Sequence, residues 1–268
     1  MSKQDASVSV IVSTYNWKEA LSLCLKSIEK QTVLPKEVII ADDGSRGDTQ
    51  EMIANISQTF PVPLIHVWHE DHGFQLSKIR NKAIAKTSGD YIIQIDGDLI
   101  LEQHFIQDHI AFRKLGSFVS GSRVLMFARL SEKLLAGNQK TIKLTSAGLK
   151  NRSNAFRFPG LSHFFASTYK ANNPAYVRGC NMAFWKKDLI AVNGYNEDIT
   201  GWGREDSELA IRLTNSGVKK KMLKFCAIAF HIYHPEATRA RLSDNDTILE
   251  ESLRMKLKVC SQGISSYL

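Results

Sequence analysis

Residues Val8–Thr14 read VSVIVST, a nearly continuous β-branched run that lacks the alternation of a half-exposed strand. Such a run is typical of a parallel strand that is buried on both faces. Apolar residues at helical spacing follow between Trp17 and Lys30, and Asn16 is placed to cap that helix. The segment therefore predicts a strand followed by a helix, which is the repeating unit of an α/β sheet.

The same alternation continues through the first half of the chain. We expect further strands at Glu37–Ala41, Leu64–Trp68, Tyr91–Ile95 and near Phe118–Leu125. Helices are expected from Asp48 (with Glu51 completing a capping box), at Leu76–Lys86 and near Gln103–Lys114. This order predicts a mostly parallel, Rossmann-like sheet with helices on both faces. In such sheets, ligands bind beyond the carboxyl ends of the strands.

The pattern weakens in the middle of the chain and then returns. From about Phe127 to Asn173, small, polar and basic residues predict a long loop region, and order returns at Tyr176–Trp185. A helix at Ser207–Ser216, a strand at Lys221–Phe230 and a helical tail from about Asp246 are expected after it.

Composition excludes several classes of protein. The 268 residues include 43% hydrophobic and 23% charged side chains, which excludes a disordered, collagen-like or disulfide-stapled chain. No run approaches ~18 apolar residues, and the start MSKQDASVSVIV lacks a small-residue cleavage site, so neither a membrane span nor a signal peptide is expected. The cysteines form no CxxC pair and favour buried free thiols in the cytoplasm: Cys24, Cys180, Cys226 and Cys260.

The net charge of +8 is concentrated in one segment. Residues 127–190 contain eleven lysines and arginines against two acids, a net charge of +9 that leaves −1 for the remainder. Lys150, Arg152 and Arg157 are among these basic residues. We expect the segment to face an anionic partner or a membrane surface, and a solvated basic loop is the alternative.

Acidic residues follow two of the expected strands. Asp96, Gly97 and Asp98 come directly after the fourth strand, and Asp42–Ser45 (DDGS) follows the second. Two carboxylates two residues apart can converge on Mg²⁺ or Mn²⁺, with Gly97 allowing close approach to the backbone. Asp43 can accept hydrogen bonds from a nucleobase or a ribose. Turns held by side-chain hydrogen bonds are the alternative for both clusters.

A third acidic cluster lies in Thr200–Glu208, which reads TGWGREDSE. Trp202 stands between two glycines on an expected turn, where its exposed ring would stack on a flat partner such as a sugar. Glu205 and Asp206 follow just before a helix, and a carboxylate there suits a general base toward a hydroxyl. Alternatively, both acids cap the helix while Trp202 packs inward.

The histidines fall into two groups. His231 and His234 (FHIYHP) follow the last expected strand, where a neutral imidazole can ligate a metal. His66, His69 and His72 are close in sequence but lie on a strand and its exit, pointing different ways. We therefore expect a metal ligand from the first group and no metal cluster from the second.

Arg80 and Asn81 lie near the start of the third expected helix, in GFQLSKIRNKAIA. Arg80 can reach a phosphate or a base, and Asn81 can hydrogen-bond to an acidic loop. A solvated helix face is the alternative for this basic stretch.

The ordered motifs resemble those of GT-A fold, family 2 glycosyltransferases. VSVIVSTYN, DDGS, the RNKAI helix and the DGD triplet match over residues 7–126. RGCNMAFWKKDLIAVNGYNEDITGWGREDSEL and HIYHP, within residues 176–236, are similar to the acceptor region of the galactosyltransferase and chondroitin-synthase type. The resemblance implies two halves that share one domain, divided into a nucleotide-sugar-binding half (1–126), a basic acceptor-side loop region (127–175), a catalytic and acceptor half (176–245) and a helical tail (246–268).

The resemblance also implies inverting transfer from a UDP-sugar to a hydroxyl of a glycan, as in the assembly of lipopolysaccharide or capsule. From the basic segment 127–190, rather than from the resemblance, we expect an acceptor that is anionic or lipid-linked, and an enzyme in the cytoplasm at the inner face of the membrane. By motif position the resemblance assigns catalysis to Asp206 and Glu205, donor binding to Thr14, Tyr15, Asp43, Arg80 and Asp96, acceptor binding to Trp202, Arg204 and Asn181, and Mn²⁺ or Mg²⁺ to Asp98, Asp96, His231 and His234. Relatives often carry a small residue in place of Arg204, which would here contact a phosphate or an acidic sugar.

Other function classes fit less well. A nucleotidyltransferase needs a glycine-rich phosphate loop after the first strand, where this chain reads STYNWKEA. A nucleic-acid-binding protein would use the +8 charge, but the chain has no recognition motif, so no nucleic-acid partner is expected. A catalytically inactive sugar- or nucleotide-binding relative stays open, because a sequence does not prove turnover.

Overall fold

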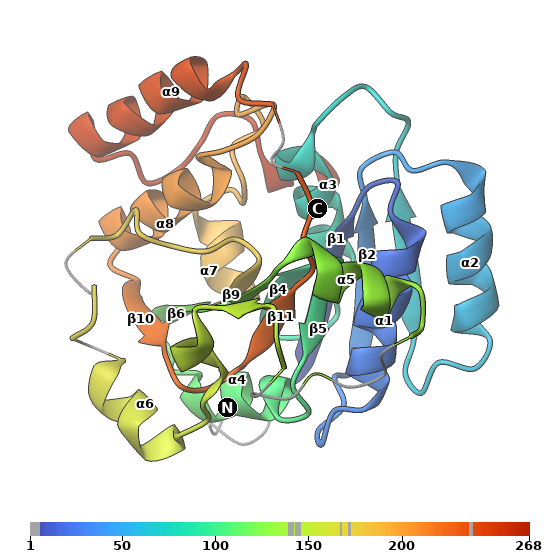
Figure 1. Cartoon of the computed structure of the whole chain (residues 1–268). Coiled ribbons are helices and arrows are strands. Elements are labelled where there is room, and N and C mark those ends of the chain that lie inside the picture. Colours follow the sequence, from blue (N-terminus) through green and yellow to red (C-terminus); the bar gives the residue numbers. More distant parts are fainter. Residues whose placement is uncertain (1–5, 139–141, 143–145, 167, 171–172, 236–237) are drawn as a thin grey trace.

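The computed structural model describes residues 6–138, 142, 146–166, 168–170, 173–235 and 238–268. Its main sheet has the strand order β10-β6-β9-β4-β1-β2-β3, with helices on both faces (Figure 1). These strands are β1 (Val8–Thr14), β2 (Glu37–Asp42), β3 (Leu64–Trp68), β4 (Tyr91–Asp96), β6 (Ser117–Gly121), β9 (Asn181–Trp185) and β10 (Lys219–Leu223). The α-helices are α1 (Lys18–Glu29), α2 (Gly47–Ser57), α3 (Leu76–Lys86), α4 (Phe105–Phe112), α5 (Ala128–Leu135), α6 (Pro159–Phe165), α7 (Lys186–Ala191), α8 (Glu205–Asn215) and α9 (Leu242–Arg254).

The pairing of the first strands places the acidic turns side by side. β1 pairs in parallel with both β2 and β4, which confirms the predicted mostly parallel α/β sheet. Thr14 lies opposite Asp42 and Ser13 lies opposite Asp96 in these ladders. The carboxyl ends of three adjacent strands therefore open on the same edge, where ligands bind in sheets of this class.

β9 runs antiparallel between β4 and β6, a position that the sequence pattern did not predict. It brings the second half of the chain into the middle of the sheet. The two halves consequently share one sheet, and the segment before β9 lies beside the carboxyl end of β4, where the Gln94 side chain donates to the Gly179 carbonyl.

A smaller sheet has the order β5-β11-β7-β8, with β5 (Leu99–Leu101), β7 (Val124–Met126), β8 (Leu149–Lys150) and β11 (Ala229–His231). The single strand expected near Phe118–Leu125 is therefore two strands, β6 and β7, which belong to different sheets. The strand expected at Lys221–Phe230 likewise divides into β10 and β11. Phe225 and Ala227 adopt positive φ angles between the latter two, which ends the extended conformation.

Apolar side chains fill both faces of the main sheet. Val10 and Val12 pack with α1 on one face, while Ile11 packs with Ile79 and Ile84 of α3 on the other. The two-sided burial of β1 follows from its uninterrupted apolar sequence. All four cysteines are buried and free, as predicted.

Both predicted helix caps were wrong. Trp17 is the N-cap of α1, and Asn16 adopts a left-handed conformation in which its side-chain oxygen accepts a hydrogen bond from the Arg46 amide (3.0 Å). α2 begins at Gly47, and Asp48 forms an ion pair with Lys18 (2.8 Å) instead of capping. The side chains of Asn16 and Asp48 thus bond across from one helix segment to the other, which ties the start of α1 to the start of α2.

The region expected to be a loop is partly regular. It contains α5, β8, a 3₁₀ helix at Arg152–Ala155 and α6. Arg157 is half-buried and forms two hydrogen bonds to Asp108 (2.5 and 3.0 Å), so its charge is paired within the fold. Lys140 and Lys143 lie outside the described residues. None of the helices in the described ranges is long and apolar enough to cross a lipid bilayer.

Candidate active site

Three acidic side chains surround a buried arginine at the carboxyl edge of the sheet. Arg80 of α3 is 1% exposed, and its Nη2 lies 3.0 Å from Oδ1 of Asp96 at the end of β4. Its Nη1 lies 3.0 Å from Oδ1 of Asp206 and 3.9 Å from Oε1 of Glu205, both in the first turn of α8. Its Nε donates to the Ser13 hydroxyl. The guanidinium thus joins the acid at the end of β4 to the acid pair at the start of α8.

The charges of this cluster are not balanced. Burial and the neighbouring charge of Asp206 together raise the pKa of Glu205 to about 8, against the opposing charge of Arg80. Its Oε2 is buried and has no hydrogen-bond partner among the described residues. Burial also raises the pKa of Asp96, against the opposing charge of Arg80. At neutral pH, Glu205 therefore holds a proton, and Asp96 and Asp206 are the two acids within 3.0 Å of Arg80.

Asp206 is held on one oxygen and leaves the other beside a glycine. The Tyr195 hydroxyl lies 3.1 Å from Oδ1 of Asp206 and 2.8 Å from Oε1 of Gln94. Burial raises the pKa of Tyr195, so the hydroxyl keeps its proton. A Cβ added to Gly179 would lie 1.6 Å from Oδ2 of Asp206. Only glycine fits there, and Oδ2 therefore lies directly against the backbone that precedes β9.

A candidate cation site lies next to this cluster. Oδ2 of Asp98 is 3.4 Å from Nε2 of His231 and 3.2 Å from Nε2 of His234, and one ligand atom from each residue lies within 4.8 Å of the others. β11 pairs with β5 so that His231 stands opposite Leu99. Oδ1 of Asp98 is buried without a hydrogen-bond partner among the described residues.

The donor set of this triad fits a divalent cation. Carboxylate oxygens suit Mg²⁺ and Mn²⁺, and imidazole nitrogens suit transition metals. Burial lowers the pKa of His231, which keeps its imidazole in the neutral form that ligates metals. The structure brings both histidines to Asp98, whereas Asp96 turns toward Arg80 and is not part of the triad.

The DDGS turn is supported by histidines. His66 lies 2.9 Å from Oδ2 of Asp42, and His69 lies 2.7 Å from Oδ1 of Asp43. His72 is exposed and does not join them: its Nε2 lies 3.7 Å from Oε2 of Glu70. The interactions explain why this acidic turn is buried.

The residues expected to bind the donor line the same edge. The backbone amide of Gln75 donates to Oδ2 of Asp43 (2.9 Å), which leaves each carboxylate oxygen one further lone pair for a nucleobase. Thr14 ends β1, and the ring of Tyr15 is half exposed while its hydroxyl donates to Asp71 (2.8 Å). Arg80 is not placed as expected, because both of its Nη atoms are already paired with carboxylates.

The expected acceptor residues occupy different environments. Trp202 is 39% exposed on its glycine turn, with the Arg239 guanidinium 5.3 Å from its ring centroid, so it does not pack inward. Arg204 has a left-handed backbone and pairs with Asp246 of α9. Its charge is therefore engaged by the tail.

Asn181 is structural rather than exposed to an acceptor. It is fully buried, and its amide donates to the carbonyls of Ser122 (2.9 Å) and Ala227 (3.2 Å). Its oxygen lies 2.9 Å from Nε2 of His109. These bonds hold the points where the chain leaves the main sheet for the smaller one.

Sequence reasoning missed Ser13 and Tyr195. Ser13 carries a detectable signal, because a polar residue in an otherwise buried strand needs a partner. Tyr195 carries none, since its segment has no periodic pattern.

A mostly parallel sheet with this acidic edge and a carboxylate–histidine triad defines a GT-A type glycosyltransferase. The family model described as "Glycosyl transferase family 2" matches residues 9–179, and the chain belongs to that family. A second model, "N-terminal domain of galactosyltransferase", matches residues 160–235. Both confirm the predicted family and the character of the second half, and the protein is accordingly an enzyme.

Two curated proteins illustrate the relationship. The chondroitin synthase of Escherichia coli is 26% identical over 245 residues, which are 84% of this chain and 34% of that protein. The uncharacterized glycosyltransferase YfnE of Bacillus subtilis is 27% identical over 259 residues, covering 85% of this chain and 65% of that protein. The chain thus spans about a third of the length of the chondroitin synthase.

Solved structures share the fold. One is the mannosyltransferase PcManGT from Pyrobaculum calidifontis, in complex with GDP-Man and Mn²⁺, with a TM-score of 0.64 at 19% identity. The match covers 93% of this chain and 64% of the PcManGT chain. Residues 1–349 of TarS from S. aureus, in complex with UDP, have a TM-score of 0.63 at 15% identity, with coverage of 97% and 68%. These likenesses confirm the predicted GT-A fold.

Proposed function

We propose that this glycosyltransferase moves a sugar from a UDP-sugar to a hydroxyl of a glycan acceptor, with inversion and with a divalent metal. The observation that carries the proposal is the joint placement of Asp206 and the Asp98–His231–His234 triad at one sheet edge. UDP and GDP-Man with Mn²⁺, bound in the two structural neighbours, support the same class of donor.

Asp98, His231 and His234 would hold the metal. Bound there, Mn²⁺ or Mg²⁺ would supply positive charge to a leaving diphosphate. Asp43 and the half-exposed ring of Tyr15 would bind the nucleoside, because they lie at the ends of β2 and β1 on this edge.

Asp206 would act as the general base. Arg80 and Tyr195 both contact its Oδ1, which fixes the carboxylate and leaves Oδ2 to take the proton of the acceptor hydroxyl. The acceptor oxygen then bonds to the anomeric carbon as the bond to the diphosphate oxygen breaks. A single displacement of this kind inverts the anomeric configuration. Glu205 keeps its proton at neutral pH and does not compete as a base.

A metal-dependence assay tests this function. A panel of UDP-sugars, with GDP-mannose as the alternative donor, is incubated with Mn²⁺ or with EDTA, and slow hydrolysis is followed without acceptor. We expect hydrolysis of one UDP-sugar that EDTA abolishes. Hydrolysis of GDP-mannose alone would overturn the UDP assignment, and hydrolysis in EDTA would overturn the role of the metal.

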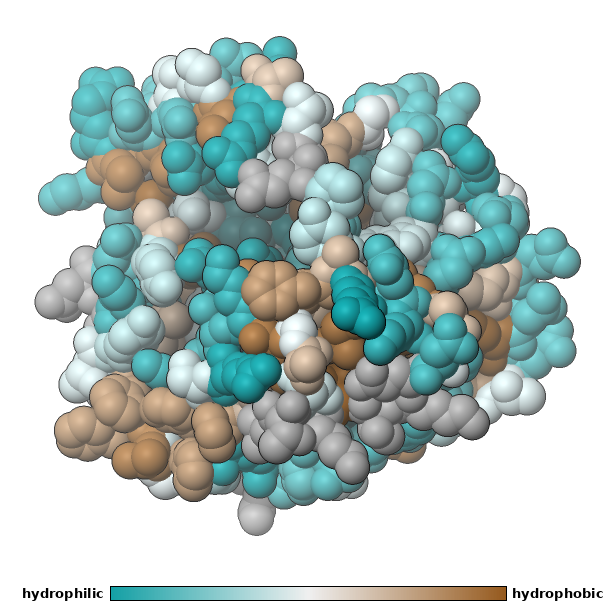
Figure 2. All heavy atoms as spheres, in the orientation of Figure 1, coloured by the Kyte–Doolittle hydropathy of each residue, from teal (hydrophilic) through white to brown (hydrophobic). Residues whose placement is uncertain are grey.

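Association with an anionic membrane surface completes the proposal. Exposed apolar side chains gather on and before α6, where Figure 2 shows hydrophobic residues at the lower left: Phe156 (45%), Phe158 (50%), Leu161 (50%) and Phe164 (70%). Exposed Lys150, Arg152 and Lys170 flank this surface in the sequence. Aromatic and basic residues together favour the interface of an anionic bilayer.

Co-sedimentation with vesicles tests the membrane proposal. We expect binding to vesicles that contain anionic lipid and little binding to neutral ones. The double variant Phe158→Ser and Phe164→Ser, or charge reversal at Lys150 and Arg152, should release the protein. Equal sedimentation of wild type and variants would contradict the proposal.

A further inference from the structure

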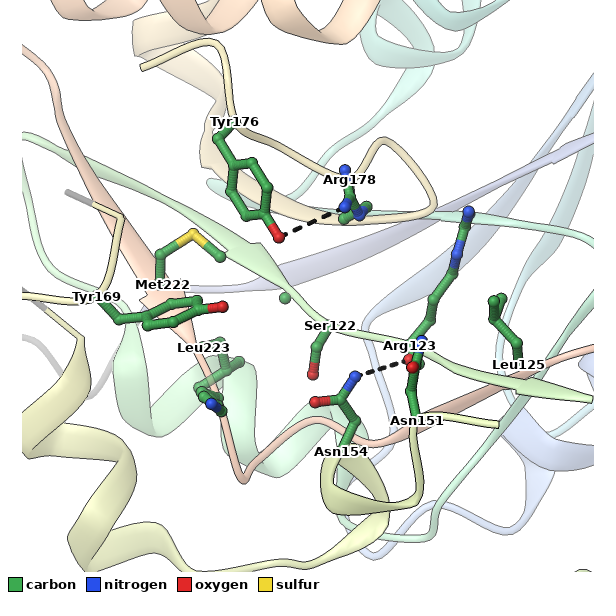
Figure 3. A pocket seen from close by; sticks show the side chains of 12 residues that line it. Ser122, Arg123, Leu125, Asn151, Asn154, Tyr169, Tyr176, Arg178, Met222 and Leu223 are labelled. Atoms are coloured by element: carbon green, nitrogen blue, oxygen red, sulfur yellow. Dashed lines mark hydrogen bonds between the residues drawn. The ribbon is translucent and has the colours of Figure 1, made fainter. Parts of the chain in front are cut away.

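A cavity of about 200 Å³ opens beside the active site, between β6, β10 and the segment before β9 (Figure 3). At about 30 Å³ per water molecule, it would hold roughly six waters, which is enough for a charged group and part of a sugar ring. Arg123, Arg178 and Lys224 line it, together with Tyr169 and Tyr176.

Among the residues that the structure describes, Arg178 and Lys224 have no acidic partner, and Arg123 interacts with Asp96 and Asp98 without forming an ion pair with either. Arg178 contacts the Tyr176 hydroxyl (3.4 Å), and its guanidinium lies 4.8 Å from the centroid of that ring. Lys224 lies 4.7 Å from the centroid of the Tyr169 ring. Arg123 contacts the Cys180 sulfur (3.4 Å). Aromatic faces and a thiol orient these charges without neutralising them, so the cavity attracts an anion.

The amides of the cavity are oriented as well. Asn154 donates to the carbonyl of Arg123 (3.0 Å), which fixes one wall, as the dashed line in Figure 3 shows. The backbone amide of Arg178 donates to the Ser120 hydroxyl (3.1 Å) on β6, which fixes the opposite wall. The backbone at Arg123 and at Arg178 is therefore held in place by these hydrogen bonds, which reduces the ordering that binding requires.

Two of the residues that line the cavity, Arg178 and Arg123, also relate it to the acids of the active site. Arg178 precedes Gly179, whose backbone touches Oδ2 of Asp206. On the other side, the charge of Arg123 interacts with Asp96 and Asp98. The cavity therefore borders the backbone that contacts the oxygen proposed to take the acceptor proton.

We propose that this cavity binds the anionic group, a carboxylate or a phosphate, of the acceptor sugar whose hydroxyl faces Asp206. The inference rests on the proposed function and names its substrate class: the acceptor is an acidic glycan. Arg178 and Lys224 are specificity-determining residues, since a neutral sugar leaves their charges unpaired. Part of the +9 charge of residues 127–190 has this local purpose, because Arg178 belongs to that segment.

Acceptor kinetics test the proposal. Three acceptors of equal length are compared, ending in a uronic acid, a sugar phosphate or a neutral hexose. Arg178→Gln and Lys224→Met should each raise KM for the preferred acidic acceptor roughly tenfold or more, and leave KM for the neutral one unchanged. Whichever of the two acidic acceptors has the lower KM in wild type shows whether the cavity binds a carboxylate or a phosphate. Lys187→Met, an exposed lysine of the same basic segment, is the matched control.

Two further measurements separate the possible outcomes. Mn²⁺-dependent UDP binding by calorimetry should be the same in Arg178→Gln and wild type, and a loss there would assign the cavity to the donor diphosphate instead. Equal KM for acidic and neutral acceptors in wild type, with transfer intact, would overturn the inference and keep the proposed function. Glucuronic acid or a sugar phosphate that binds wild type but not Arg178→Gln, in a protein that transfers nothing, would overturn the proposed function and keep the anion site.

Discussion

Arg80 and Arg212 are the two largest fully buried side chains, and their surroundings differ in one respect. Arg212 lies on α8 and forms two hydrogen bonds of 2.7 Å with a single acid, Glu208. Its remaining donors reach the carbonyls of Val192 and Gly194. The pair carries no net charge, and both side chains are closed to solvent.

Arg80, by contrast, faces three acids. Glu205 holds a proton, and Asp206 contacts Arg80 through a single oxygen. Asp96 is partly open to solvent. A balanced pair specifies packing, whereas surplus negative charge at an open edge is what a cation or a proton-accepting base requires. Burial alone therefore does not distinguish a structural arginine from one in an active site. The number of acids around the guanidinium does.

Removing the base should give the largest effect. Asp206→Asn keeps the shape of the side chain but cannot take the acceptor proton, so kcat should fall by roughly 10²- to 10⁴-fold. Mn²⁺-dependent binding of UDP should persist in calorimetry. Asp246→Asn, at the exposed partner of Arg204, is the control and should keep activity. Full transfer by Asp206→Asn would remove the base assignment.

Breaking the balanced pair should destabilise the fold instead. Arg212→Met leaves the Glu208 carboxylate buried without its partner, so the free energy of unfolding should fall by about 3–5 kcal/mol. Urea denaturation measures this loss in the free energy of unfolding, provided that the m-value of the variant equals that of wild type. The double variant with Glu208→Leu should recover most of the loss. If Arg212→Met were as stable as wild type, the contrast between the two arginines would not hold.

Altering the triad should give a smaller, binding-specific effect. Asp98→Asn weakens the charge that attracts the metal, so the affinity for UDP in the presence of Mn²⁺ should fall roughly 10- to 100-fold. His72→Asn, at an exposed histidine outside the triad, should bind as wild type does. Unchanged titration calorimetry for Asp98→Asn would count against this site.

The smallest effect concerns the proton on Glu205. Because burial raises its pKa from 4.5 to about 8, the folded chain binds a proton that the unfolded chain releases above about pH 4.5. The associated stability is fully present below pH 4.5 and is lost as pH rises through about 8. Glu205→Gln removes this dependence, so its stability relative to wild type should rise by on the order of 1–2 kcal/mol between about pH 5 and 8. The free energies of unfolding of the variant and of wild type are measured by denaturation at about pH 5 and about pH 8. A difference between the two proteins that is the same at both pH values would contradict the raised pKa of Glu205.

The sequence predicted the positions of the acids better than their partners. Strand ends are local features, because an apolar run such as Tyr91–Ile95 must stop where Asp96 begins, and parallel strands end on one edge. The approach of His231 and His234 to Asp98 was expected only from the family resemblance, which also included Asp96 in the metal set. The pairing of Arg80 with Asp206 was not accessible, since 126 residues separate them and only long-range packing brings them together.

The same limit explains Asn181 and Arg157. Asn181 stood in an acceptor-like motif, but the insertion of β9 between two strands buries it, and strand order is not encoded locally. Arg157 belonged to a basic segment, yet Asp108 of a distant helix neutralises it. A charge count along the chain does not show which charges are paired across the fold.

The antiparallel insertion of β9 has a consequence for synthesis of the chain. β4 is complete once residue 96 has left the ribosome, but its second neighbour, Asn181–Trp185, follows 85 residues later. Until then, the side of β4 that β9 will cover presents unpaired backbone groups, and unpaired strand edges are prone to wrong pairing. The order of synthesis therefore leaves one edge of the strand that carries Asp96 unpaired until Asn181–Trp185 has been made.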